Sequence, residues 1–292
     1  MIGIYWGLVG ALFIGVSDGI VRVTAQRLSI TILILFIMGI TTIFLSFWYL
    51  IGWKLPAWDF YSWMVSILSG FLNLVAVGLL YTALARGPVY LASPTSSSFA
   101  IFLILFNTLN GEPYTLPQLL SGIVVFIGIF FLSRPKKNET IVDKYSNKYL
   151  QITALLGLGA GITIALRFFL AQEAVSILGP VDSLYLNRVS SFIFILFFFI
   201  WQHIRLVKYS WPKGTTLGLV FLQSLLENIA IAAFLFGSIG NGRIGATIGF
   251  SAYAVITTIT TWIWLGEKVP LIKSIWIIII TAAVINAIIF AP

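Results

Sequence analysis

The sequence predicts an all-α polytopic membrane protein with ten transmembrane helices arranged as a 5+5 inverted repeat. Three observations lead to this fold class. The 292 residues are 60% hydrophobic and only 9% charged, which is more apolar than a soluble domain of this size can bury. The apolar segments are continuous rather than alternating, which excludes a β-barrel. Identical residues also recur at one fixed offset in the two halves of the chain.

Ten apolar runs are long enough to cross a bilayer, which takes about 20 helical residues. The first run begins at Ile2 with no basic segment before it, so we expect a span rather than a cleavable signal. One hydrophilic segment, 134–148, divides the chain into two five-span units, 1–133 and 149–292. The predicted spans are 2–21, 30–52, 60–85, 88–109, 115–133, 149–172, 180–202, 214–237, 243–265 and 270–290.

The two units look like copies of one another. In five pairs of identical residues, the two members lie 155 positions apart, so the two segments align without an insertion or deletion. Because five is an odd number, the second unit would cross the membrane in the opposite direction to the first. Inverted repeats commonly place a substrate site near the middle of the bilayer between the halves. The pairs are Asn73 and Asn228, Gly87 and Gly242, Ser96 and Ser251, Gly111 and Gly266, and Glu112 and Glu267.

The basic residues predict the orientation in the membrane. Thirteen lysines and arginines fall in loops on one side, including the 134–148 linker, and only Lys54 and Arg243 fall on the other. The positive side of a membrane protein is normally cytoplasmic, so we expect the linker inside the cell and both termini outside, in the cell (inner) membrane. The net charge of +8 is therefore a topology signal and does not indicate nucleic-acid binding.

The most informative polar cluster lies in the span 214–237. Gln223 and Glu227 share one helical face, and Asn228 lies beside them. A carboxylate at the middle of the bilayer costs several kcal/mol unless it has a partner, binds a proton or faces water. We expect Glu227 to hold a substrate cation or a coupling proton, and Gln223 and Asn228 to offer hydrogen bonds to a substrate.

Two arginines also lie inside predicted spans, Arg167 and Arg188. In one interpretation they line an outer vestibule that attracts the anionic group of a substrate. In the other they pair with Glu173, Asp182 or Glu227 and lock helices together. Asp18 and Arg22 are four residues apart in the first span, so we expect them to pair with each other.

The span 88–109 contains Pro94, which removes one helical hydrogen bond and predicts a kink. Small hydroxyl residues around it either line a cavity or allow close helix packing, and both interpretations stay open. Further candidates for the cavity wall, in this and other spans, are Asn73, Tyr81, Tyr90, Ser97, Ser251 and Tyr253.

One segment resembles a known family. It reads Leu109-Asn110-Gly111-Glu112-Pro113-Tyr114-Thr115-Leu116-Pro117-Gln118 and is followed by Gly122 and Gly128. With the ten spans and the repeat, it resembles the ten-span EamA-type exporters of the drug/metabolite transporter superfamily. The second copy, Gly266-Glu267-Lys268, lacks the later glycines. The resemblance implies a secondary transporter that moves amino acids or other small metabolites, usually outward, through a cavity between the halves.

The preferred hypothesis is an alternating-access exporter of a small polar or amphipathic metabolite. Its expected partners are that small molecule, the lipid bilayer and protons as candidate coupling ions, with no nucleic acid, in a monomer or homodimer. An integral-membrane enzyme acting on lipid-linked substrates is the alternative, and the single histidine, His203, with no cysteine argues against it. A non-transporting scaffold is a further alternative. We expect no catalytic residue, cofactor or metal.

Overall fold

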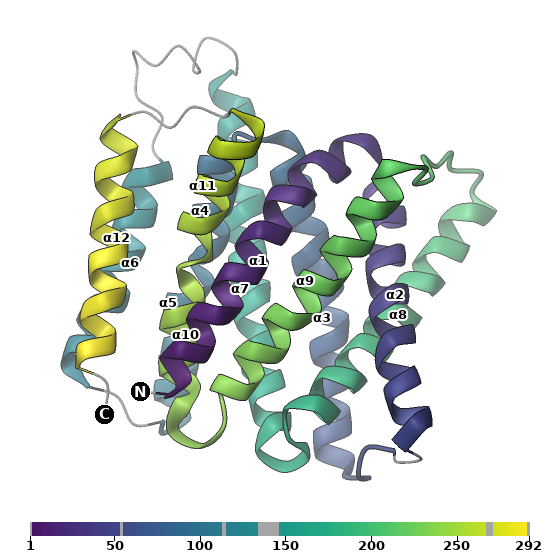
Figure 1. Cartoon of the computed structure of the whole chain (residues 1–292), viewed down its shortest axis with the longest axis horizontal. Helices are drawn as coiled ribbons and strands as arrows, with labels where there is room; N and C mark the ends of the chain where they lie inside the picture. Colours follow the sequence, from purple (N-terminus) through teal and green to yellow (C-terminus); the bar gives the residue numbers. More distant parts are fainter. Residues whose placement is uncertain (1, 53–54, 113–114, 134–145, 267–270, 291–292) are drawn as a thin grey trace.

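The computed structural model describes residues 2–52, 55–112, 115–133, 146–266 and 271–290, and its regular elements there are all helices (Figure 1). The all-α fold predicted from the sequence is confirmed. In chain order the helices are α1 (Ile2–Arg27), α2 (Ile30–Gly52), α3 (Phe60–Arg86), α4 (Val89–Ser97), α5 (Phe99–Leu109), α6 (Leu116–Ser133), α7 (Asn147–Leu178), α8 (Pro180–Ile204), α9 (Thr215–Gly237), η2 (Gly240–Gly242), α10 (Arg243–Ser251), α11 (Tyr253–Leu265) and α12 (Leu271–Ile289).

Eight of the ten predicted spans are helical segments that are long and apolar enough to cross a membrane. The other two correspond to α6 and α12, of 18 and 19 residues, so the count of ten stays a prediction. The first helix continues to Arg27 instead of ending at residue 21, and α7 extends to Leu178. The start of α1 and the end of α12 lie at the same end of the bundle (Figure 1).

The outside of the bundle is apolar. Ile43, Phe197 and Ile263 are 69%, 66% and 74% exposed, respectively. Water would not favour such a surface, but lipid tails solvate it. The interior, by contrast, contains many buried polar and charged side chains. These polar groups lie within a largely apolar core, which fits a bundle whose polar side chains face one another or an internal space.

Glycine allows the two halves to approach closely. Gly7 in α1 and Gly161 in α7 each end a Gly-x-x-x-Gly pair. A Cβ on Gly7 would lie 2.4 Å from the carbonyl oxygen of Ala246 in α10, and one on Gly161 would lie 2.5 Å from Oγ of Ser98. Only glycine fits these contacts, as in other small-residue helix interfaces of membrane proteins. The first helix of each half is thereby pressed against an interrupted helix of the other half.

The two interruptions are alike. The predicted span 88–109 of the first half is divided into α4 and α5 at Ser98. The predicted span 243–265 of the second half is divided into α10 and α11 at Ala252. At both places the backbone switches to tighter i to i−3 hydrogen bonds, from Ser98 N–H to Thr95 and from Ala252 N–H to Gly249. The break thus lies four residues beyond the kink predicted at Pro94, which stays inside α4. The second break has no proline, so the tightened turn rather than the ring is the shared cause.

Helices of the two halves contact each other in matching pairs. The first helix of each half packs on the third of the other, α1 on α9 and α7 on α3. The helices α6 and α12 lie side by side at one edge of the bundle, and α2 and α8 lie together toward the other (Figure 1). This arrangement is consistent with the inverted repeat, which stays a prediction. The division into units 1–133 and 149–292 remains a prediction.

Several predicted features lie outside the described residues, namely Lys54, Glu267 and most of the 134–148 linker. On the loop before α3, Asp59 caps the helix. Its Oδ2 accepts hydrogen bonds from the backbone N–H and the hydroxyl of Ser62, at 2.8 and 2.6 Å. These bonds favour the charged form and hold the pKa of Asp59 below its ordinary value.

Candidate functional site

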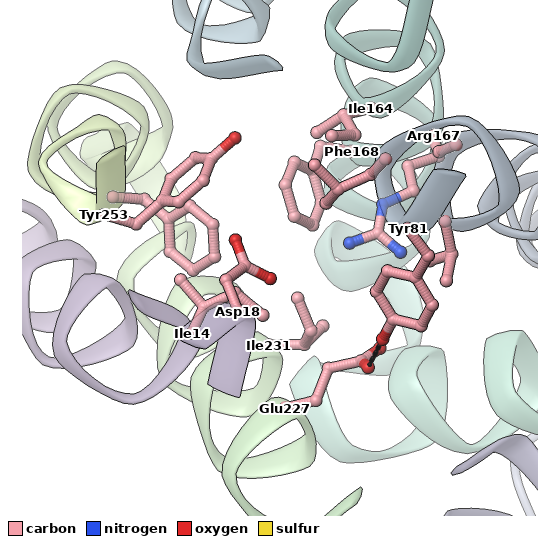
Figure 2. Close-up of a pocket in the computed structure, with 13 residues that line it drawn as sticks. Ile14, Asp18, Tyr81, Ile164, Arg167, Phe168, Glu227, Ile231 and Tyr253 are labelled. Atoms are coloured by element: carbon pink, nitrogen blue, oxygen red, sulfur yellow. Dashed lines mark hydrogen bonds between the residues drawn. The ribbon is translucent and has the colours of Figure 1, made fainter. Parts of the chain in front are cut away.

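A narrow cavity lies between the halves, walled by α1, α3, α7, α9, α10 and α11 (Figure 2). About 440 Å³ between its side chains is free of atoms, but only about 30 Å³ admits the centre of a water-sized sphere. The smaller volume decides what fits: one or two water molecules, with no room for a metabolite. A solute therefore needs the walls to separate. The polar residues of the wall are Asp18, Tyr81, Arg167, Glu227 and Tyr253.

Glu227 on α9 is paired. One carboxylate oxygen lies 3.1 Å from Nη1 of Arg188, and the other accepts a hydrogen bond of 2.8 Å from the Tyr81 hydroxyl (Figure 2). The Tyr81 oxygen in turn accepts from Nε2 of Gln223 at 3.0 Å, and Oε1 of Gln223 accepts from the Thr24 hydroxyl at 3.1 Å. This network connects α1, α3, α8 and α9. Glu227 therefore borders the cavity and has a charged partner, one of the alternatives that its depth in the membrane allows.

Arg188 is fully buried and is not part of the cavity wall, unlike Arg167. Of the interpretations of Arg188, an ion pair with Glu227 is the one observed. Its Nη1 also lies 3.5 Å from the sulfur of Met38, while its Nε and Nη2 find no hydrogen-bond partner in the described part of the chain. Nearby, Asn73 donates to the Ser191 hydroxyl at 3.1 Å. The contacts of α8 thus hold Arg188 next to Glu227 and outside the cavity wall.

Asp18 on α1 faces the cavity, which the sequence did not indicate. Its side chain is 1% exposed, and Oδ2 has no hydrogen-bond partner among the described residues. The predicted pairing with Arg22 is wrong. Arg22 instead donates to the carbonyl oxygens of Leu84 and Ala85, at 2.8 and 2.7 Å. Carbonyls at the end of a helix lack helical partners and so attract such a donor.

Arg167 enters the cavity from α7, on the wall opposite Asp18 (Figure 2). Its residue is 7% exposed, and its Cζ lies 4.3 Å from the ring centre of Phe168. Its Nε has no hydrogen-bond partner within the described ranges. No ion pair joins Arg167 to Asp18 or to another described acid. The two side chains present opposite charges to the same space without touching.

Tyr253 connects the interrupted helices of the two halves, because its hydroxyl lies 2.7 Å from Oγ of Ser96. Other predicted site residues pack outside the cavity wall. Ser251 donates to the carbonyl of Ile248 within its own helix, and Tyr90 packs with Leu150. The predicted residues that do not form the cavity wall are Asn73, Tyr90, Ser97, Arg188, Gln223, Asn228 and Ser251.

A second charged cluster lies at the start of α10, near the end of the bundle that carries the chain termini. Arg243 is 3.2 Å from a carboxylate oxygen of Glu112 and also pairs with Glu173, whose carboxylate accepts from Asn110 at 3.0 Å. Glu112 thus links the end of α5 to α10, and Glu173 links α7 to the same arginine. At the other end of the bundle, Arg86 lies 4.0 Å from the ring centre of Tyr149.

Comparison with known proteins agrees with this architecture. Residues 1–134 match the model of the EamA-like transporter family, which confirms the resemblance for the first half of the chain. That family indicates a membrane transporter of small molecules. Twenty-five chains of solved structures match. One, described only as the crystal structure of a protein, is 14% identical and covers 99% of this chain and 97% of its own, with a TM-score of 0.75. At that identity it shows the fold alone. A search among curated proteins found no match.

Proposed function

We propose that this protein is a secondary active transporter that exports a small polar or amphipathic metabolite, such as an amino acid, by alternating access. One observation carries the proposal: helices of both halves enclose a cavity with acidic and basic side chains inside otherwise apolar spans. Buried charges in a membrane bundle are costly and mark pathways for ions or substrates. The EamA-like match of the first half supports the same class.

Contacts on both sides of the cavity support alternation. On one side, Arg243 and Glu112 join the second half to the first. On the other, Nε of Arg86 at the end of α3 donates to the Thr153 hydroxyl of α7 at 3.3 Å. A pathway to either side requires that one of these sets separates while the other holds. The side that carries the 134–148 linker would be cytoplasmic, and the side that carries both termini would face outward.

Glu227 remains the candidate for proton coupling. Protonation would remove the charge that binds Arg188 and would leave one hydrogen bond in place of an ion pair. Because Arg188 lies on α8 and Glu227 on α9, the change would loosen two neighbouring helices next to the cavity. A proton could in this way alter the packing of the second half during the transport cycle.

Counterflow in proteoliposomes tests the proposal. Vesicles are loaded with unlabelled members of a metabolite panel, and uptake of the labelled compound is followed with and without a pH gradient. We expect exchange of at least one compound, and accumulation that depends on the gradient. Absence of exchange for the whole panel, with correctly inserted protein, would contradict transport.

The Glu227→Gln variant tests the coupling separately from transport. It keeps the shape of the side chain and one hydrogen-bond acceptor but cannot change charge. We expect exchange to continue while gradient-driven accumulation is lost. If the variant retains the full pH dependence of the wild type, Glu227 does not carry the proton.

A further inference from the structure

Two ionisable side chains in the cavity wall, Asp18 and Arg167, form no ion pair with any residue that the structure describes. They are 1% and 7% exposed, and Oδ2 of Asp18 and Nε of Arg167 lack hydrogen bonds to any described residue. The neighbouring Glu227 and Arg188 form an ion pair, in which Nη1 of Arg188 lies 3.1 Å from the carboxylate. Asp18 and Arg167 are thus the acid and the base of the cavity wall that form no ion pair with a described residue.

Burial of a single ion in an apolar environment is strongly unfavourable unless an opposite charge or a polar group approaches it or, for a carboxylate, a proton binds. Asp18 and Arg167 could meet that need by pairing with each other, but they lie on opposite walls (Figure 2). The space between them is bordered by the apolar side chains of Ile14, Phe168 and Phe250. A ligand that satisfies both would need a positive group at one end, a negative group at the other and an apolar body.

We propose that Asp18 and Arg167 are the two poles of a binding site for a zwitterionic substrate. The cationic group of the substrate lies against the Asp18 carboxylate, and its anionic group lies against the Arg167 guanidinium. The aromatic rings of Phe168 and Phe250 contact its apolar part. This inference rests on the proposed transport function and specifies its substrate class, together with the residues that recognise it.

The position of the two poles relates binding to the transport cycle. Asp18 lies on α1 and Arg167 on α7, the first helix of each half. A ligand held at both ends therefore joins the halves directly. The cavity as it stands holds only one or two water molecules, so the walls must part to admit the ligand and close again upon it. A ligand with only one of the two charges would bind one half and leave the other pole unsatisfied.

The first experiment compares ligands on the wild-type protein. The twenty common amino acids, betaine and carnitine are screened by ligand-induced thermal shift and by counterflow. Each amino acid that binds is then compared with its methyl ester, which has only the positive charge, and its N-acetyl form, which has only the negative charge. We expect the zwitterion to bind about 10- to 100-fold more tightly than either derivative, since each loses a charged hydrogen-bonding pair.

The outcomes separate this inference from the proposed function. Transport of singly charged or uncharged solutes, with no zwitterion preferred, would overturn the zwitterion site and leave transport intact. Absence of binding and flux for every compound, including the wider metabolite panel, would contradict both.

Two variants provide a crossed test that a merely structural role would not pass. Asp18→Asn should weaken the zwitterion about 10- to 100-fold but leave the N-acetyl form unchanged, because that ligand has no positive group to lose. Arg167→Gln should weaken the zwitterion and spare the methyl ester. Asp59→Asn and Arg205→Gln, which make the same changes away from the cavity, should bind all three ligands as the wild type does.

Equal losses for all three ligands in both cavity variants would overturn the assignment. If either variant does not fold, Asp18→Glu and Arg167→Lys keep the charges and move their position. They should keep the preference for the zwitterion over both derivatives, and loss of that preference in a folded protein, or its absence in the wild type, would count against the inference.

Discussion

Two acid–base pairs lie in the core of this bundle, and they differ in one respect. Glu227 and Arg188 are 3.1 Å apart, with the Tyr81 hydroxyl on the remaining carboxylate oxygen. Asp18 and Arg167 face each other across a cavity without contact (Figure 2). Removing one member of the first pair would leave the other charge buried without a counter-ion, whereas on the proposal above the second pair presents two charges to a solute. Depth in the membrane alone does not distinguish these roles.

The topology explains the difference. Arg188 and Glu227 lie on α8 and α9, consecutive helices of the second half, and the packing of these helices brings the two side chains into contact. Asp18 and Arg167 lie on helices of different halves. On the alternating-access proposal, the cavity between them opens and closes, so their separation would change during transport. This contrast predicts which substitutions affect stability and which affect ligand binding.

The largest effect is expected from breaking the ion pair of Glu227 and Arg188. Glu227→Leu leaves Arg188 buried without a counter-ion, and we expect it to lower the free energy of unfolding by about 3–5 kcal/mol. The double variant Glu227→Leu with Arg188→Met replaces both charges by apolar groups and should recover most of that loss. Equilibrium unfolding in mixed micelles measures both. Losses that simply add in the double variant would show that the two residues do not act as a pair.

A smaller loss is expected from Tyr81→Phe. The hydroxyl donates to Glu227 at 2.8 Å and accepts from Gln223 at 3.0 Å, so its removal leaves two buried polar groups short of a partner. We expect the free energy of unfolding to fall by about 1–3 kcal/mol. In the Glu227→Leu background the same change should cost less, because the carboxylate is already absent. The same cost in both backgrounds would contradict the network.

The smallest effect on stability is expected from substitution of Asp18, which forms no ion pair with Arg167. Asp18→Asn removes a charge that has no partner, so the free energy of unfolding should stay within about 1 kcal/mol of the wild type or rise. Binding of the zwitterion should nevertheless fall. Parallel unfolding and binding measurements on the same preparation check both statements. A loss of stability as large as that of Glu227→Leu would mean that Asp18 has a structural partner after all.

Much of the fold follows from hydropathy. Every predicted span contains helix, because unbroken apolar runs leave a membrane chain few alternatives. The bounds agree less well, since α1 and α7 extend beyond their predicted ends. The polar face of α9 was also predictable, since helical spacing placed Gln223 and Glu227 together and their burial agrees. What the sequence could not supply is the partner of each charge. Arg188 has the expected depth, but its contact with Glu227 depends on how α8 packs on α9.

Asp18 shows most clearly that the partner of a charged residue cannot be predicted from the sequence alone. A cation four residues away on the same helix is the nearest partner along the chain, and it led to the wrong pairing. The carbonyls of Leu84 and Ala85, distant in sequence, take that guanidinium instead. The signal that could have found Asp18 is a carboxylate within an apolar span, the same signal that identified Glu227. Helix breaks at Ser98 and Ala252 were missed because their cause is a tightened turn and not a proline.

Cysteine labelling of the cavity tests the transport account most directly. The chain contains no cysteine, so a single one can be introduced without a background. Ala76 is fully buried and borders the cavity, and Ala165 is equally buried but does not border it. Vesicles of each orientation are treated with a membrane-impermeant thiol reagent, with and without a bound ligand. We predict that Ala76→Cys is labelled from both sides and Ala165→Cys from neither. A folded Ala76→Cys protein that stays unlabelled from both sides would contradict alternating access to this cavity.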